Sequence, residues 1–127
     1  MITGISIVSV PVDDTDDAIE FYCGVLGMEK RKDLPMGGDT RYVEVAPPGS
    51  LTALSPYTYY TGGPAQATIG EYSRMVLRVD DVHRAYTELG AKGVKFVGEP
   101  FSAPGGIFVK FVDPWNNLYL LTDNTDF

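Results

Sequence analysis

The sequence predicts an α+β fold in which two tandem β-α-β-β-β modules form a curved mixed sheet around a concave cavity, with the helices on the outer face. Three observations lead to this fold class. The composition is that of a globular domain, the hydrophobic pattern switches between strand and helix periods, and the second half repeats the first at a steady offset. We therefore expect a single domain over residues 1–127, made of modules at about 1–60 and 70–127.

The composition excludes several classes of protein. Of the 127 residues, 44% are hydrophobic and 21% are charged, as in ordinary globular domains. The start of the chain has no basic region followed by a long apolar run, and no window approaches the roughly 20 apolar residues of a membrane span. The single cysteine, Cys23, excludes an internal disulfide framework. We expect a cytoplasmic protein that has no contact with membranes.

The charge argues against a nucleic-acid partner. The net charge is −7, and the densest basic cluster is the three-residue run Lys30–Lys32. The chain has one histidine, His83, which excludes any metal or catalytic site that needs two.

The first half has the pattern of a strand, a helix and three more strands. Residues 4–12 alternate and contain many β-branched side chains. The acidic run Asp13–Asp17 suits a helix start, and Gly27 stands where a glycine often ends a helix, which predicts a helix over 15–26. The later strands of this half are expected at 28–34, 41–46 and 51–55, followed by a long loop over 56–72.

The second half repeats this order. Asp80 and Asp81 begin a predicted helix over 82–90, which ends near Gly90 or Gly93. The strands of this half are expected at 74–79, 95–97, 107–112 and 118–122.

The match between the halves is specific in position. Val12-Asp13-Asp14 recurs as Val79-Asp80-Asp81, 67 residues later, and residues 42–45 match residues 108–111 at an offset of 66. An offset near half the chain length indicates a duplication and a pseudo-two-fold structure.

Strand alternation predicts which side chains lie on the face away from the helices. Val43 and Val45 should face the helix, so Tyr42 and Glu44 point the other way. In the matching strand, Phe108 and Lys110 lie on the open side. Aromatic and charged groups together suit a ligand cavity, but the pattern fits a solvated sheet face equally well.

Two segments resemble a known family. The opening VPVDDTDDAIEFYCGVLGMEKRKD resembles the start of the vicinal-oxygen-chelate superfamily, which includes glyoxalase I, bleomycin-resistance proteins and extradiol dioxygenases. The segment Phe111–Asn117 resembles the family's F-x-DPDGN turn, with Trp115 in place of Asp and Asn116 in place of Gly. Asparagine tolerates a left-handed conformation, so the turn can survive. The resemblance covers essentially the whole chain and implies the tandem architecture described above.

The resemblance also implies where a metal would bind in metal-using members. Their ligands come from the first and last strands of each half, commonly histidines and acidic residues. The corresponding positions here are Ile7, about Ala53, Arg74 and Leu120. Isoleucine, alanine and leucine offer no donor atom, and arginine carries a fixed positive charge. We therefore expect no metal, no cofactor, and neither glyoxalase I nor extradiol dioxygenase activity.

Arg74 is the expected positive group of the cavity. A guanidinium there can bind a carboxylate or phosphate, or it can pair with Glu44, and the sequence leaves both readings open. Glu44 and Lys110 hold matching positions with opposite charge. They can pair with each other, or offer one acceptor and one donor to a ligand.

The remaining polar residues are more simply explained by structural roles than by a functional site. His83 suits a solvated helix surface, Cys23 a packing position, and Asp13–Asp17 a helix cap. The tyrosines of the long loop, Tyr57, Tyr59 and Tyr60, suit a lid over the cavity or a subunit interface.

These observations favour a metal-free protein that binds a small, partly apolar molecule, without chemistry. The expected ligand-binding residues are Ile7, Tyr42, Glu44, Arg74, Phe108, Lys110 and Leu120. The alternative is a metal-independent lyase or isomerase with Glu44 as acid/base and Arg74 or Lys110 stabilising an anion. A third reading is an interaction subunit without a small ligand. The predicted assembly is a homodimer.

Overall fold

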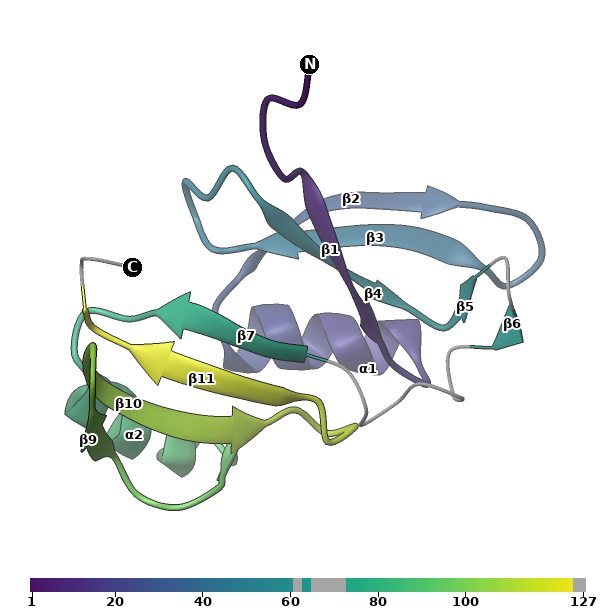
Figure 1. Cartoon of the computed structure of the whole chain (residues 1–127). Helices are drawn as coiled ribbons and strands as arrows, with labels where there is room; N and C mark the ends of the chain where they lie inside the picture. Colours follow the sequence, from purple (N-terminus) through teal and green to yellow (C-terminus); the bar gives the residue numbers. More distant parts are fainter. Residues whose placement is uncertain (61–62, 65–72, 125–127) are drawn as a thin grey trace. The chain divides into compact units, whose positions relative to one another are not determined.

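The computed structural model describes residues 1–60, 63–64 and 73–124, and it divides the chain into two compact units, Met1–Ile69 and Gly70–Phe127 (Figure 1). Within the described ranges, no helix is long and apolar enough to cross a membrane.

The first unit is a mixed four-stranded sheet with one helix. Its strands run in the order β1-β4-β3-β2, with β1 parallel to β4 and the other pairs antiparallel. The elements are β1 (Ile7–Pro11), α1 (Thr15–Ile19) continued by the π-helix η1 (Glu20–Val25), β2 (Glu29–Pro35), β3 (Arg41–Ala46) and β4 (Ala53–Tyr57). A two-residue strand pair, β5 (Tyr59–Tyr60) with β6 (Gly63–Pro64), follows.

The second unit has the same plan with one extra strand. Its order is β7-β11-β10-β8, with β9 also paired to β10, and β7 lies parallel to β11. The elements are β7 (Ser73–Arg78), α2 (Val82–Ala91), β8 (Lys95–Phe96), β9 (Phe101–Ala103), β10 (Gly106–Val112) and β11 (Leu118–Thr122). The α+β class and the tandem modules are thus confirmed, with one mixed sheet in each unit. The cavity expected from both modules together stays a prediction.

Both helices begin as the sequence predicts. The Asp14 carboxylate accepts a hydrogen bond from the backbone N–H of Asp17, and Asp81 does the same for Arg84. The predicted helix over 82–90 is confirmed as α2. The predicted helix over 15–26 is present, but its second half is a π-helix, in which Leu26 N–H donates to the carbonyl of Phe21.

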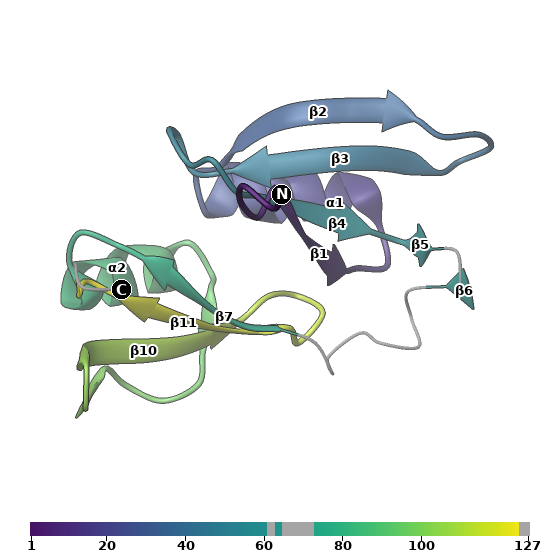
Figure 2. The ribbon, with the colours of Figure 1, turned by 45° about the horizontal axis from the view of Figure 1, so that its top comes forward.

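Each helix covers one face of its own sheet (Figure 2). Val43 and Val45 are fully buried on that face in the first unit, as the alternation predicts. In the second unit Val109 and Phe111 are fully buried, and the Phe111 ring stacks on Tyr119 at 5.0 Å. Burial of these apolar faces stabilises each unit.

The strand boundaries correct the sequence analysis at β1, β4 and β9, the pair β5–β6 lies within the loop expected at 56–72, and the ends of several other strands shift by one residue. The first strand begins at Ile7 rather than residue 4. The strand expected at 51–55 lies at Ala53–Tyr57, because β4 is aligned by parallel pairing with β1. The strand β9 was not expected, because Gly98 and Pro100 interrupt the pattern before it. In the loop expected at 56–72, residues 56–57 belong to β4, and residues 61–62 and 65–72 lie outside the described residues.

The turn between β10 and β11 keeps its form despite the substitutions within it. Asn116 has a φ of 64°, the left-handed conformation that asparagine was expected to tolerate there. Asp113 accepts hydrogen bonds from the N–H groups of Trp115 and Asn117 and from the Asn117 side chain, at 2.9, 2.9 and 2.7 Å. Asp113 is only 2% exposed, so this carboxylate organises the turn from the inside.

Candidate functional site: the open faces of the two sheets

Each sheet has one face opposite its helix, which we call the open face. Residues paired across neighbouring strands share a face, so the register assigns them. The open face of the first unit carries Ile7, Lys32, Leu34, Tyr42, Glu44 and Ser55. The open face of the second unit carries Val76, Arg78, Lys95, Phe101, Phe108, Lys110 and Leu120.

Glu44 is the most buried charged group of the first open face. It is 8% exposed, and its Oε2 accepts a hydrogen bond of 2.6 Å from the Tyr42 hydroxyl. The Lys32 ammonium lies 3.5 Å from the same oxygen. The hydrogen bond to Glu44, helped by burial and the carboxylate's charge, raises the pKa of Tyr42 to about 12. A phenol, a carboxylate and an ammonium thus form one polar cluster, of which sequence reasoning missed Lys32.

The second open face combines two phenylalanines with a lysine. Phe101 on β9 pairs in register with Phe108 on β10, and their rings stack at 6.0 Å between centroids, 26° apart. The Lys110 ammonium lies 5.7 Å from the centroid of Phe101. Phe108 is 7% exposed, whereas Phe101 is 37% exposed. The two rings therefore form an apolar surface that solvent reaches mainly at Phe101.

The charged residues of the second open face whose side chains are described are all cations. They are Arg78, Lys95 and Lys110, and no carboxylate lies within 4.0 Å of any of them in the part of the chain that the structure describes. This face is locally positive in a chain whose net charge is −7.

The two open faces repeat the same layout with opposite charge. Leu34 lies beside Tyr42 as Phe101 lies beside Phe108. Phe101 follows Leu34 by 67 residues, and Phe108 follows Tyr42 by 66 residues. Glu44 in one unit corresponds to Lys110 in the other. The offset that revealed the duplication could have identified Phe101, because Leu34 already stood in a predicted strand.

The comparison with known proteins agrees with this architecture. The family described as Glyoxalase/Bleomycin resistance protein/Dioxygenase superfamily matches residues 4–120. The chain belongs to this superfamily.

Three similar proteins match nearly the whole chain. The uncharacterized protein YetH of Bacillus subtilis is 32% identical over 123 residues, which cover 97% of this chain and 100% of YetH. A superfamily member from Sphaerobacter thermophilus has a TM-score of 0.83 at 31% identity, covering 94% of this chain and 96% of that one. TnmS3, an antibiotic binding protein from Streptomyces sp. CB03234, has a TM-score of 0.82 at 32% identity, covering 95% of each chain.

The positions that hold metal in some superfamily members carry no suitable donor set here. The register pairs Ser9 with Ser55 in the first unit and Val76 with Leu120 in the second. Ser9 and Val76 correspond at the 67-residue offset, so Ser55, rather than the expected Ala53, is the counterpart of Leu120. Isoleucine at position 7, serine at 55 and leucine at 120 provide neither an imidazole nor a carboxylate. Among the described residues, no group of three or more His, Cys, Asp or Glu side chains could hold a metal ion. The residues therefore do not fit a superfamily metal centre.

Most of the predicted site residues lie on the open faces. Ile7 is half-buried on β1, and Leu120 is half-buried on β11. Arg74 belongs to β7, but its side chain lies outside the described residues, so its predicted role is untested. The same holds for the side chains of Tyr59 and Tyr60, whereas Tyr57 is half-buried at the end of β4.

His83 and Cys23 lie in the environments that the sequence analysis expects for a surface residue and a packing residue. His83 is exposed in the first turn of α2. Cys23 is half-buried in the π-helix, where burial raises the pKa of its thiol and makes it less reactive.

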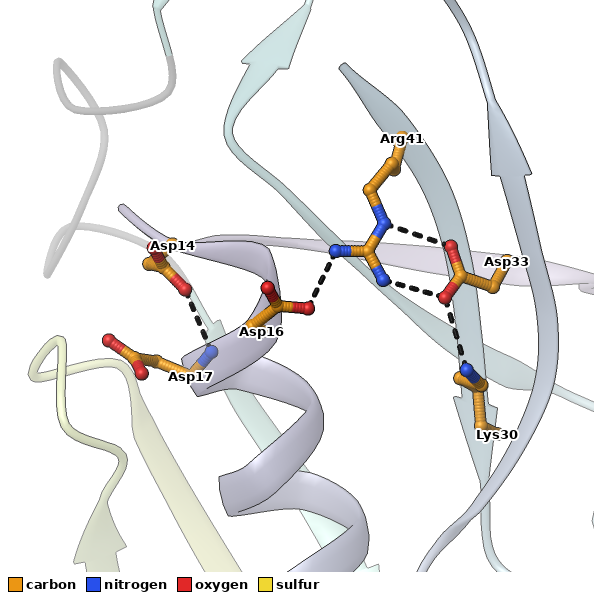
Figure 3. A network of polar contacts seen from close by, with 6 residues as sticks. All are labelled: Asp14, Asp16, Asp17, Lys30, Asp33 and Arg41. Carbon is orange, nitrogen blue, oxygen red and sulfur yellow. Dashed lines mark hydrogen bonds and ion pairs between the residues drawn. The ribbon is translucent and has the colours of Figure 1, made fainter. Parts of the chain in front are cut away.

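The acidic start of α1 is tied to the sheet by Arg41 (Figure 3). The guanidinium of Arg41 donates to both carboxylate oxygens of Asp33, at 3.0 and 2.6 Å, and to Asp16 at 2.7 Å. The nearby pocket has a volume of about 260 Å³ and lies at this helix end rather than on an open face. Of its lining carboxylates, Asp13, Asp14 and Asp16 lie at a helix start that is capped by Asp14 and paired with Arg41, and Asp39 lies in the turn before β3. We therefore assign this cluster a structural role.

Arg41 should make the protein's stability sensitive to acid. Hydrogen bonds from Arg41 and then Lys30 lower the pKa of Asp33 to about 2. A carboxylate with a lowered pKa stabilises the fold above its unfolded-state pKa of about 4, and this contribution is lost as the pH falls to about 2. We expect Arg41→Met to lose part of this pH dependence, so its urea midpoint should change less than that of the parent between about pH 5 and pH 2. Arg84→Met, on exposed α2 with ion pairs at 3.9 Å, is the control, and equal slopes in Arg41→Met and the parent would contradict the assignment.

Proposed function

We propose that this protein binds a small, partly apolar organic molecule on the open faces of its sheets, without a metal ion. The observation that carries this proposal is the chemistry at three positions: Ile7 and Leu120 suit contact with an apolar ligand, and neither they nor Ser55 offers the imidazole or carboxylate that ligation of a cation requires. The similarity to TnmS3, an antibiotic binding protein, supports the same reading.

The open faces have the parts that such binding requires. Exposed apolar side chains, Leu34 and Val76 among them, lie beside a small number of polar groups. Apolar contact excludes water from the ligand, and each polar group then orients one ligand atom. Phe108 and Lys110 offer an aromatic wall and a cation, and Glu44 offers an acceptor.

The proposal is tested by ligand binding with and without a chelator. We expect at least one member of a panel of small aromatic acids and aromatic antibiotics to raise the melting temperature, and the shift to persist in excess EDTA. Arg74, the positive group that the sequence predicts in the cavity, should contribute a charged hydrogen bond to a ligand that carries a carboxylate, so Arg74→Leu should weaken binding of that ligand by about 1.5–3 kcal/mol in calorimetry. Arg84→Leu on the exposed side of α2 is the matched control. Binding that disappears with EDTA, or a panel without any ligand, would overturn the proposal.

A second function is favoured by the environment of Glu44. A buried carboxylate with a short hydrogen bond to a tyrosine is a suitable general acid/base, with Arg74 or Lys110 available to stabilise an anion. In this alternative the protein is a metal-independent lyase or isomerase. Homodimer assembly and a cytoplasmic location stay predictions in either case.

A further inference from the structure

The second open face carries two stacked phenylalanines and a neighbouring lysine, a combination that is not found at the equivalent positions of the first open face. Both units place an exposed apolar residue at the equivalent position, but it is leucine in the first unit and phenylalanine in the second. Leu34 stands beside a tyrosine whose hydroxyl is bonded to Glu44. Phe101 stands beside Phe108 and under the Lys110 ammonium. The second face therefore has stacking surface and an available cation at the same place.

The geometry leaves Phe101 available to a further ring. Phe108 is almost buried and supports Phe101 from one side at 6.0 Å. More than a third of Phe101 is exposed, and the aromatic surface on offer favours stacked or edge-to-face contact with another flat ring. A saturated ring of the same size cannot make this contact equally well, because it has no π-face.

The charges of this face select the sign of the ligand. Arg78 lies in the same cross-strand row as Phe108 and Phe101, and Lys110 lies in the next row. These cations have no carboxylate partner among the described side chains, so an incoming anion does not have to displace one. Salt screens exposed charges beyond about 8 Å, so the local cations outweigh the acidity of the chain as a whole.

We infer that Phe101, Phe108 and Lys110 form a subsite for a flat aromatic molecule that carries a carboxylate or similar anionic group. Phe101 is the specificity-determining residue, because its ring distinguishes aromatic from aliphatic ligands. Lys110 binds the anionic group. Its ammonium lies 5.7 Å from the Phe101 centroid, so it can contact a carboxylate carried by a ring that packs against Phe101. This inference rests on the proposed function and names the ligand class of that same face.

Three matched probes test the inference by calorimetry. They are 2-naphthoate, its saturated analogue decahydro-2-naphthoate, and the neutral 2-naphthalenemethanol. We expect the parent protein to bind 2-naphthoate about tenfold more tightly than the saturated acid. Phe101→Leu should remove this preference and leave the affinity for the saturated acid within about twofold, whereas Phe101→Tyr should keep the preference.

The charge is tested separately. Lys110→Met should weaken both acids by about tenfold and leave the neutral alcohol unchanged, and Lys110→Arg should retain the affinity for the acids. Lys92→Met, at the exposed end of α2, is the control for the loss of one positive charge. Circular dichroism and melting temperature verify that each variant is folded.

The outcomes separate the two proposals. Binding of both acids with equal affinity, or a preference that survives Phe101→Leu, would overturn the inference while leaving ligand binding intact. If 2-naphthoate does not bind the folded parent, the inference is wrong. The proposed function is then judged by the broader ligand panel, whose complete failure overturns it independently.

Discussion

Asp113→Ala is expected to lower the free energy of unfolding by about 3 kcal/mol, because it removes a buried carboxylate that accepts three hydrogen bonds. Asp113 accepts from two backbone N–H groups and from the side-chain amide of Asn117, and Asn117 is fully buried. Alanine can replace none of these bonds. Asp113, Trp115 and Asn117 are all buried, so water cannot replace the lost bonds without opening the turn. The destabilisation should appear as a lower urea midpoint with an unchanged slope.

An exposed aspartate provides the control for this prediction. The side chain of Asp80 is 97% exposed, so Asp80→Ala should change the free energy of unfolding by no more than about 0.5 kcal/mol. If Asp113→Ala were as stable as Asp80→Ala, the carboxylate would not be organising the β10–β11 turn.

Glu44→Gln is expected to lower the pKa of Tyr42 from about 12 toward its ordinary value near 10, which is about a hundredfold change in its ionisation constant. The carboxylate of Glu44 accepts the hydrogen bond of the phenol and opposes formation of a second negative charge 2.6 Å away. Glutamine keeps the shape but removes the charge. The measurement is an alkaline titration of phenolate absorbance, with Tyr42→Phe identifying the component that belongs to Tyr42.

The hydrogen bond between Tyr42 and Glu44 should also make the stability of the fold depend on pH in the alkaline range. The pKa of Tyr42 is higher in the folded state than in the unfolded state. The protonated phenol therefore contributes fully to the free energy of unfolding below about pH 10, and this contribution is lost as the pH rises to about 12. Tyr42→Phe should therefore show less alkaline loss of stability than the parent. Titration curves that coincide for Glu44→Gln and the parent would show that Glu44 does not control this phenol.

Glu44→Gln also decides between the two proposed functions. If Glu44 only binds or orients the ligand, the variant should alter affinity for a ligand from the panel, and neither protein should convert it to product. If Glu44 is an acid/base, the variant should keep affinity and lose turnover of a substrate that the parent converts. Product analysis by mass spectrometry separates these outcomes for every ligand that binds.

Local chemistry made much of the fold predictable. The aspartates that cap α1 and α2 act through bonds to residues three positions away, so their role is contained in a short segment of sequence. The alternation at residues 41–46 identified which valines are buried, because successive side chains of a strand point to opposite faces. Asparagine at position 116 was expected to tolerate a left-handed conformation and so preserve the turn that resembles the family's motif, and its φ is 64°.

The composition of the site was less predictable, because it depends on register between distant strands. Ser55, rather than Ala53, corresponds to Leu120, and only the pairing of β1 with β4 and of β7 with β11 shows this. Phe101 lies in a strand of three residues that has no pattern of its own and exists through pairing with β10. Lys32 reaches Glu44 because a bulge in β2 after Lys30 places it opposite that residue.

The sequence by itself determined the duplication, the two helices with their caps, and the face of each sheet that is buried, because each follows from residue type, spacing or alternation. Tertiary structure alone decided which side chains become neighbours on the open faces. The contact of Glu44 with Lys32, and of Phe101 with Phe108 and Lys110, joins residues from different strands. Hydrogen bonding between strands sets the register, and a shift of one residue would move every one of these side chains to the opposite face.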